Sequence, residues 1–402
     1  MQQFADWLIT HIPHPAFIPN EYLYAGVQLL FALLMLMVFV APFAGIVSFV
    51  ERRIAARMMD RIGPNRVGPQ GFLQWIADGV KSLLKEDIIP TAADPFLFRL
   101  GPYLVFVGMF LAFVAIPFSS RLIISDLDVG IFYILSVTSV VTVGIMMSGW
   151  GSNNKYSLLG GMRSAAQIVS YEIPSGLAIL VIVLLSGTLS LQGIIAGQGA
   201  YPWQWYLFDN PFTTVTFFIL FISALAEGNR TPFDIPEAES ELVAGYSTEY
   251  SGMRFVFFYF EEWANLYLIA AIGTSLFLGG WQIPTAVHAW AVSVSRFLPQ
   301  ILEFLTFFLK ASVIVFVVIW IRWTLPRVRV DQLMSLCWKY LTPIGFATVA
   351  GTAVWMVLFP GGVPIVRYFL CSGALAATIY FFYRVGYQMR KSGSELYLNP
   401  FV

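Results

Sequence analysis

A stretch of 29 residues without a charged side chain, from Tyr22 to Val50, constrains the fold of this chain more than any other feature. At about 1.5 Å per residue, a helix of that length exceeds the roughly 30 Å hydrocarbon core of a bilayer. We therefore expect it to cross a membrane with a tilt or to project beyond it. Hydrophobic residues make up 58% of the sequence and charged residues 11%, which is typical of a polytopic membrane protein.

Further apolar segments of helical length follow, and they predict an all-α membrane protein that forms one domain over residues 1–402. The predicted transmembrane helices are nine: 22–50, 100–119, 131–149, 164–186, 212–227, 255–280, 301–322, 341–359 and 364–384. The fifth is the shortest, because Pro211 to Ala226 supplies only about 15 apolar residues, or about 22 Å. We expect it to cross the bilayer only if the helix continues through Glu227.

The basic residues are distributed unevenly between the two sets of loops. Of the 23 lysines and arginines, 19 fall in or beside connections on one side, and two, Arg121 and Arg296, fall on the other. The positive-inside rule therefore predicts an external N-terminus and a C-terminus in the cytoplasm or matrix.

The long connection after the first span contains the segment "PQGFLQWIADGVKSLLKED". Its apolar residues recur at spacings of three and four: Phe72, Trp75, Ile76, Val80, Leu83 and Leu84. Charged and amide side chains lie on the opposite side. This pattern predicts an amphipathic helix over 70–85 that lies along the membrane surface, either as an anchor or as the roof of a cavity.

Six carboxylic acids crowd into the predicted loop 227–254, on the basic side between the fifth and sixth spans. They are Glu227, Asp234, Glu237, Glu239, Glu241 and Glu249. Two overlapping helix-start signals in "TPFDIPEAE" predict a short helix over about 236–246. Clustering and partial burial both raise carboxyl pKa values. The loop is therefore a candidate proton relay, with a solvated acidic loop as the alternative.

Other acids lie inside predicted spans. Glu172 is about eight residues into the fourth, roughly 12 Å deep, where a carboxylate costs about 2.5–3.5 kcal/mol. We expect it to face the bundle interior and to handle protons; the alternative is a structural partner for a buried donor. In the sixth span, Glu261 and Glu262 point about 100° apart, so one should face the interior. The helix geometry does not say which.

Several functional classes find no support. Net charge is zero, so nothing indicates a nucleic-acid partner. Cys337 and Cys371 are isolated, the three histidines lack metal-ligand spacing, and no GxGxxG follows a strand-like run. We therefore predict no metal or redox cofactor bound by this chain. A secondary transporter remains an alternative, although the two halves show no convincing internal repeat of the kind common in transporters.

Four long blocks resemble a known family. They are "ERRIAARMMDRIGPNRVGPQGFLQWIADGVK" (51–81), "AAQIVSYEIP" (165–174), "EGNRTPFDIPEAESELVAGYSTEYSG" (227–252) and "RVRVDQLMSLCWKYLTP" (327–343). Together they are similar to the membrane protein that forms the quinone chamber of respiratory complex I, which occurs in a bacterial and a mitochondrial form. The blocks occur in order, and the resemblance extends from residue 22 to about 360.

This resemblance implies an oxidoreductase subunit that has no catalytic residue or cofactor of its own. Quinone is the implied substrate, and the FMN and iron–sulfur clusters belong to partner subunits of the peripheral arm. Small and antiporter-like membrane subunits are further implied partners. The implied quinone-chamber residues are Glu51, Arg52, Arg61, Asp78, Arg230, Arg327, Arg329 and Asp331. The implied proton path comprises Glu172, Glu227, Asp234, Glu237, Glu241 and Glu262, which selects Glu262 over Glu261.

The sequence also departs from the family pattern. Many members have eight spans, so the ninth favours a bacterial inner membrane over the mitochondrial inner membrane. Related hydrogenases and photosynthetic complexes carry similar subunits and are alternatives. The unbroken "NRTPFD" and "ESELV" motifs favour the respiratory form. The stretch before Glu21 has no counterpart in the resemblance.

Overall fold

The structure, a computed structural model, describes residues 20–393 except Glu237 and Arg296. Within these ranges every regular element is a helix or helical turn, and no β-strand occurs, which confirms the all-α prediction. The predicted external N-terminus and the end of the C-terminal tail lie outside the described residues. The main helices are α2 (Asn20–Met35), α3 (Ala41–Met58), α5 (Pro95–Ala112), α6 (Gly130–Gly151), α7 (Lys155–Ser186), α9 (Pro211–Glu227), α11 (Gly252–Phe277), α13 (Leu298–Thr324), α14 (Val330–Ser335), α15 (Thr342–Leu358) and α16 (Pro364–Gly393).

Eight helical segments of the described chain are long and apolar enough to cross a membrane. Helix α9 is apolar but has only 17 residues, and it is not one of these eight. It does continue through Glu227, which is the condition that the sequence set for crossing the bilayer. At about 1.5 Å per residue it reaches about 25 Å. Asn210 begins this helix by accepting a hydrogen bond from the Thr213 amide at 2.8 Å.

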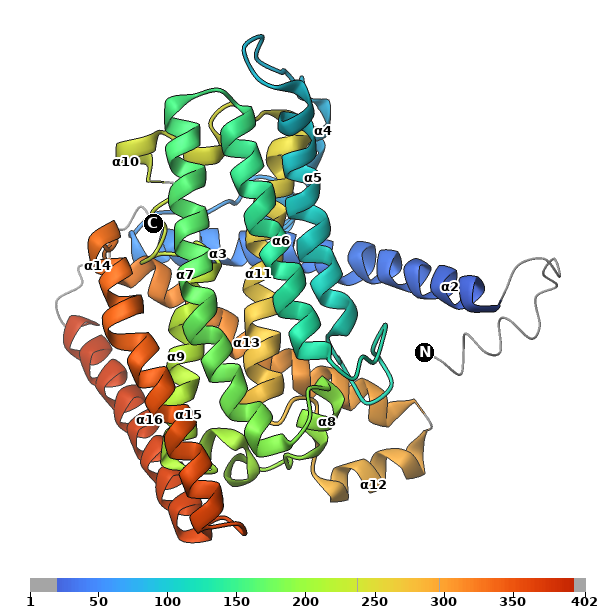
Figure 1. The fold of residues 1–402 in the computed structure, drawn as a ribbon, viewed down its shortest axis with the longest axis vertical. Helices are drawn as coiled ribbons and strands as arrows, with labels where there is room; N and C mark the ends of the chain where they lie inside the picture. Colours follow the sequence, from blue (N-terminus) through green and yellow to red (C-terminus); the bar gives the residue numbers. More distant parts are fainter. Residues whose placement is uncertain (1–19, 237, 296, 394–402) are drawn as a thin grey trace.

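The helices form a bundle that a long N-terminal helix crosses (Figure 1). Most of the bundle helices run along the long axis of the molecule, whereas α2 and α3 lie across it and the far end of α2 projects away from the bundle. Short α4 (Gln74–Leu84) and α10 (Glu239–Leu242) lie at one end. Short α8 (Leu191–Ala196) and α12 (Thr285–Val294) lie at the other. We call the end that carries α4 and α10 the basic end, because the lysine- and arginine-rich connections are found there.

Two π-turns interrupt the helices. One, Leu36–Val40, joins α2 to α3, and the other, Leu336–Leu341, joins α14 to α15. In the second, the Cys337 thiol donates to the Ser170 carbonyl at 3.1 Å, and the Tyr171 hydroxyl donates to the Leu333 carbonyl at 2.9 Å. These bonds attach the turn to the middle of α7. Single π-turns inside helices are frequent at functional sites.

The predicted surface helix is present as α4 and follows a 3₁₀ turn, Pro69–Gly71. The helix packs closely on α3, where a Cβ on Gly45 would lie only 2.4 Å from the Trp75 ring. The remaining apolar residues stay largely open, with Leu83 66% and Leu84 83% exposed. An amphipathic helix with an open apolar side suits an interfacial position at the membrane surface.

The acidic connection differs from its prediction. The expected helix over about 236–246 shrinks to α10, four residues long. Val243 then takes a positive φ of 67°, which ends the helix, and a 3₁₀ turn follows at Gly245–Ser247. The cause is packing against α7. A Cβ on Gly160 would lie 2.6 Å from Gly245, and Ser157 donates to the Tyr246 carbonyl at 3.1 Å.

Helix α7 is also longer than predicted. It begins at Lys155 and not at 164, because the Asn154 side chain caps it by accepting from the Tyr156 amide at 2.9 Å. Pro174 lies within the helix without ending it. Glu172 therefore sits 17 residues from the start of a 32-residue helix, near its middle.

Candidate functional site

The site is built around Arg230, which lies in the turn after α9. Gln167 of α7 holds this turn at both ends, since its Nε2 donates to the carbonyls of Ala226 and Phe233, each at 2.8 Å. Asn229 adopts the left-handed conformation with φ 48°, which asparagine tolerates better than most residues. The turn is thereby fixed against α7, and it directs Arg230 into the bundle, where the residue is 2% exposed.

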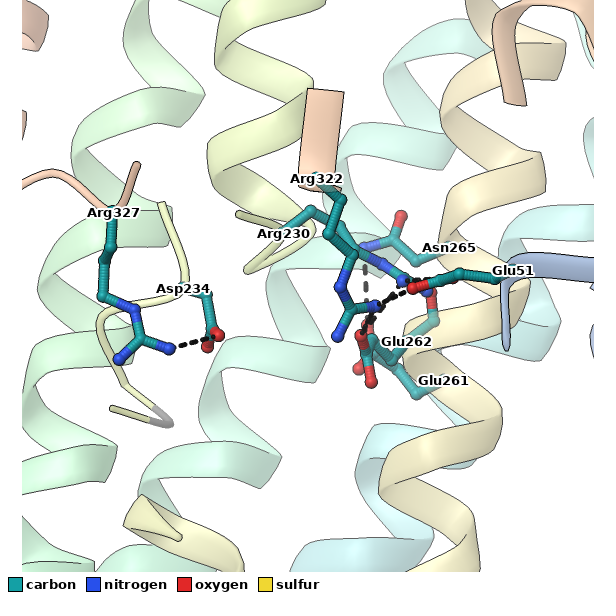
Figure 2. Close-up of polar contacts among 8 residues, drawn as sticks. All are labelled: Glu51, Arg230, Asp234, Glu261, Glu262, Asn265, Arg322 and Arg327. Carbon is teal, nitrogen blue, oxygen red and sulfur yellow. Dashed lines mark hydrogen bonds and ion pairs between the residues drawn. The ribbon is translucent and has the colours of Figure 1, made fainter. Parts of the chain in front are cut away.

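Arg230 meets two acids and a second arginine in a buried charge cluster (Figure 2). Its Nη1 lies 3.3 Å from Glu51 of α3 and 3.2 Å from Glu262 of α11. Arg322, at the end of α13, approaches the same two carboxylates at 2.8 Å and 3.2 Å. Each arginine therefore bridges both acids. We call Glu51, Arg230, Glu262 and Arg322 the charge cluster.

Further contacts fix the cluster. Arg230 Nη2 donates to the Glu262 carbonyl at 3.1 Å, and its guanidinium lies 4.4 Å from the centre of the Trp263 ring. A guanidinium over an indole face is a favourable cation–π arrangement. Glu261 is also buried, 7% exposed, and accepts from Asn265 at 3.4 Å. Two positive charges thus face two paired acids, with a third acid one residue away.

An outer ion pair flanks the cluster. Asp234 accepts from Arg327 Nη2 at 2.8 Å, and Figure 2 shows this pair beside the charge cluster. Burial raises the pKa of the Asp234 carboxyl, and the neighbouring Arg327 charge opposes that rise. Its Oδ1 is buried without a hydrogen-bond partner among the described residues. An acid under these opposing influences is suited to change its charge when the local field changes.

A second pair of acids lies in the bundle, with Glu172 in α7 and Glu227 at the end of α9. Glu172 accepts a hydrogen bond from the Ser139 hydroxyl of α6 at 2.9 Å. Glu227, the last residue of α9, lies beside the Ser175 hydroxyl and within electrostatic reach of Glu172. Its Oε1 is buried and has no partner within the described part of the chain. Both carboxyl groups face neighbouring helices, as expected for acids inside a membrane span.

The other residues predicted for the site are placed differently. Arg52 and Asp78 form a separate pair at 2.6 Å between α3 and α4. Glu241 is 60% exposed and pairs with Arg163 at 2.6 Å, away from the charge cluster. The remaining predicted chamber residues are exposed: Arg61, Arg329 and Asp331. Glu237 lies outside the described residues. The roles of all these side chains stay predictions.

Sequence reasoning did not assign a role to Arg322 or Glu261. Arg322 follows a long apolar segment and was counted only among the loop charges that set the orientation. Helix α13 continues past it to Thr324, so it belongs to the bundle. The sequence did carry a signal for this pairing: Arg322 lies near the end of one span, and Glu262 lies near the start of another on the same side of the membrane. Glu261 was disfavoured by the resemblance, yet it is the more buried of the two, at 7% exposed against 14% for the Glu262 side chain.

Comparison with known proteins identifies the family of this chain. The NADH dehydrogenase family model matches residues 31–383. The H subunit of NADH-quinone oxidoreductase from Anaeromyxobacter dehalogenans is 54% identical, over 86% of this chain and 86% of that protein. The protein of the same name from Chlorobaculum tepidum is 50% identical over 76% of this chain and 86% of its own length. That from Chlorobium luteolum is 49% identical over 77% and 84%. These matches confirm the resemblance found in the sequence, and the chain belongs to the NADH dehydrogenase family.

Proposed function

We propose that this chain forms the quinone-access chamber of a proton-pumping NADH–quinone oxidoreductase and the start of its acidic proton-coupling path. The charge cluster is the observation that carries the proposal. Three helices and one turn converge on it, and it places two arginines and two acids in the interior of a membrane protein. Such groups are costly in a membrane and usually mark substrate or ion pathways.

In this proposal the chamber lies at the basic end, below α4. The Arg52–Asp78 pair joins α4 to α3 at its rim, and the charge cluster and the Asp234–Arg327 pair form its polar lining. The open apolar side of α4 offers a surface along which a lipid-soluble quinone can approach from the bilayer. The quinone is a substrate, and this chain holds no redox centre. Flavin and iron–sulfur clusters belong to partner subunits of the peripheral arm.

The proton path begins where the chamber meets the deeper acids. Reduction of a quinone to a quinol takes up two electrons and two protons, so the charge beside the cluster changes when side chains there supply the protons. Asp234 is a candidate to respond, since burial raises the pKa of its carboxyl and the Arg327 charge lowers it. Glu227 and Glu172 then continue the path between α7 and α9 toward the neighbouring membrane subunits. The chain would lie in a bacterial inner membrane, with the N-terminus outside.

The decisive variant is Glu227→Gln in the assembled complex, measured in membrane vesicles. Glutamine keeps the shape of the side chain but carries no transferable proton. We expect NADH oxidation with an artificial acceptor at the flavin to persist, while quinone-coupled proton pumping falls to a small fraction of the wild-type rate. Glu86→Gln, at an exposed acid on the same end of the molecule, is the matched control and should pump normally.

Two outcomes would count against the proposal. If an assembled Glu227→Gln complex pumps at the wild-type rate, Glu227 is not on the path. Purification from native membranes tests the rest: flavin and iron–sulfur proteins should co-purify with the chain. A stable, lone protein that transports ions would instead favour the secondary transporter.

A further inference from the structure

A cluster of aromatic rings fills the bundle where the crossing helix passes α11 and α13. Phe39 lies in the first π-turn, Phe43 in α3 and Tyr267 in α11. The others come from the end of α5, the connection after it, and α13. We call the whole set the ring cluster: Phe39, Phe43, Phe113, Phe118, Tyr267, Phe304, Phe307 and Phe308.

The rings interlock closely. Phe39 lies at the centre, with ring centroids 5.1 Å from Phe118, 5.3 Å from Tyr267 and 5.7 Å from Phe304, all edge-on. Phe43 meets Tyr267 at 4.6 Å. Edge-on rings with centroids about 4.5–7 Å apart are a favourable aromatic geometry. Phe118 and Tyr267 are each 1% exposed, and the partly buried rings of the cluster pack against this core.

The ring cluster lies between two polar regions of the same bundle. Helix α13 carries Arg322 of the charge cluster at one end and Glu303 at the other, 19 residues or about 28 Å apart. Phe304, Phe307 and Phe308 form the turn next to Glu303. In α11, Tyr267 follows Glu262 by five residues, about 7 Å. The rings therefore separate the charge cluster from the polar groups at the opposite end.

Those polar groups reach the surface. Glu303 is 3% exposed and accepts from the Ser120 amide at 2.9 Å and the Ser120 hydroxyl at 2.6 Å. His288 of α12 lies 3.9 Å from its other oxygen, and the His288 side chain is 49% exposed. A chain of polar groups thus runs from the surface at the opposite end to Glu303, and Phe304, Phe307 and Phe308 occupy the next turn of α13.

We propose that the ring cluster is an insulating barrier that blocks proton passage through this chain between the charge cluster and the His288–Glu303 pair. A hydrated ion that enters a packed apolar constriction must give up its water, and hydrophobic constrictions close channels in this way. The barrier keeps the internal acids in contact with one side of the membrane only. Its purpose rests on the proposed function, because insulation matters where acids move protons across an energised membrane.

The test measures passive proton leak in proteoliposomes that hold the purified, intact complex carrying Phe39→Ser and Phe304→Ser. A potassium diffusion potential drives proton entry, and an internal pH dye reports it, with neither NADH nor quinone present. Removing two adjoining rings should admit water. We expect the leak to rise about tenfold, which corresponds to a barrier lowered by about 1.4 kcal/mol.

Two matched variants define the comparison. Tyr267→Phe keeps the ring and removes only a hydroxyl that has no partner in the described structure, so its leak should equal that of wild type. Phe132→Ser removes a ring that is 63% exposed on α6, outside the cluster, and should not leak either. If the double variant does not assemble, Phe39→Ser alone should show a smaller rise in the same direction.

An assembled variant with a wild-type leak would overturn the barrier. Because the assay needs no turnover, it is independent of the proposed function. A wild-type complex that cannot reduce quinone would refute the quinone chamber and leave the leak result standing.

Discussion

Arg230 illustrates how one residue can hold several elements together, since it bridges acids from α3 and α11 while buried at 2% exposure. We predict that Arg230→Leu lowers the free energy of unfolding by about 3–5 kcal/mol, because it leaves buried carboxylates with half of their positive partners. Thermal unfolding of the chain in detergent measures this. Arg163→Leu breaks an exposed pair and should cost less than about 1 kcal/mol. Equal losses in the two variants would contradict the prediction.

Asp234 gives a prediction about pH. Its pKa is raised above the ordinary 3.8 by burial, so near that value the folded state binds more protons than the unfolded state. Stability then falls as pH rises through this range, and Asp234→Asn removes the effect. We expect the stability of wild type relative to Asp234→Asn to decrease between about pH 4 and pH 7. Unfolding temperatures of both proteins across that range provide the check, and an increase would refute the assignment.

At the residue scale, the sequence indicated which charged side chains belong to the site, but it did not indicate which of them form ion pairs with one another. Glu51 and Arg230 were expected in the quinone chamber and Glu262 on the proton path, and the structure brings the three side chains together. They were assigned to two different sets, however, because the motifs do not reveal that Glu51 and Glu262 share the same arginines. Arg322 received no role, since its partners lie 60 or more residues away in the chain.

Among the elements, α4 packs closely on α3, where Gly45 faces the Trp75 ring. A Cβ on Gly45 would lie 2.4 Å from the Trp75 ring, so we predict that Gly45→Leu displaces α4 and costs about 1–3 kcal/mol of local stability. Limited trypsin digestion in vesicles should then cut faster at Lys81 and Lys85. Gly79→Ala is the control on the same helix, because nothing lies within 4 Å of its added Cβ. That variant should resist trypsin as well as wild type or better.

Element boundaries were predictable where hydrophobicity decided them and not where packing did. The first span is a long helix with a large tilt to the bundle, as the uncharged run of residues indicated. The short acidic helix was overestimated, because capping signals describe local preferences only. Close packing of Gly245 on Gly160 overrides them. The π-turns leave no signature in hydrophobic periodicity, and they were not anticipated.

At the scale of the molecule, α16 is loosely attached. None of its spanning segment is buried, and its described contacts include the Arg367–Asp209 ion pair and the Phe381–Trp320 ring contact at 5.4 Å. We predict that truncation after Phe359 leaves the charge cluster intact and lowers the unfolding temperature by a few degrees at most. The assembled complex should retain most of its quinone reduction rate. Loss of that activity despite assembly would show that α16 contributes to the site.

The overall architecture was the most predictable level, because a bilayer restricts a spanning chain to helices and apolar length identifies them. How these helices meet was not predictable. Contacts such as Gly101 against Ser148, where an added Cβ would lie 2.1 Å from the hydroxyl, depend on small residues that hydropathy does not distinguish.

The π-turn at Leu36–Val40 places one additional residue in the helix that carries Phe39 and Phe43 and leads on to Glu51. Each residue of an α-helix turns the chain by about 100°. Deleting one residue from the turn would therefore convert it to regular α-helix and rotate all of α2 about its axis by that angle, while α3 stays in place. The turn therefore sets the rotation of α2 about the helix axis relative to α3. It determines which side chains the projecting α2 presents, independently of how α3 packs in the bundle.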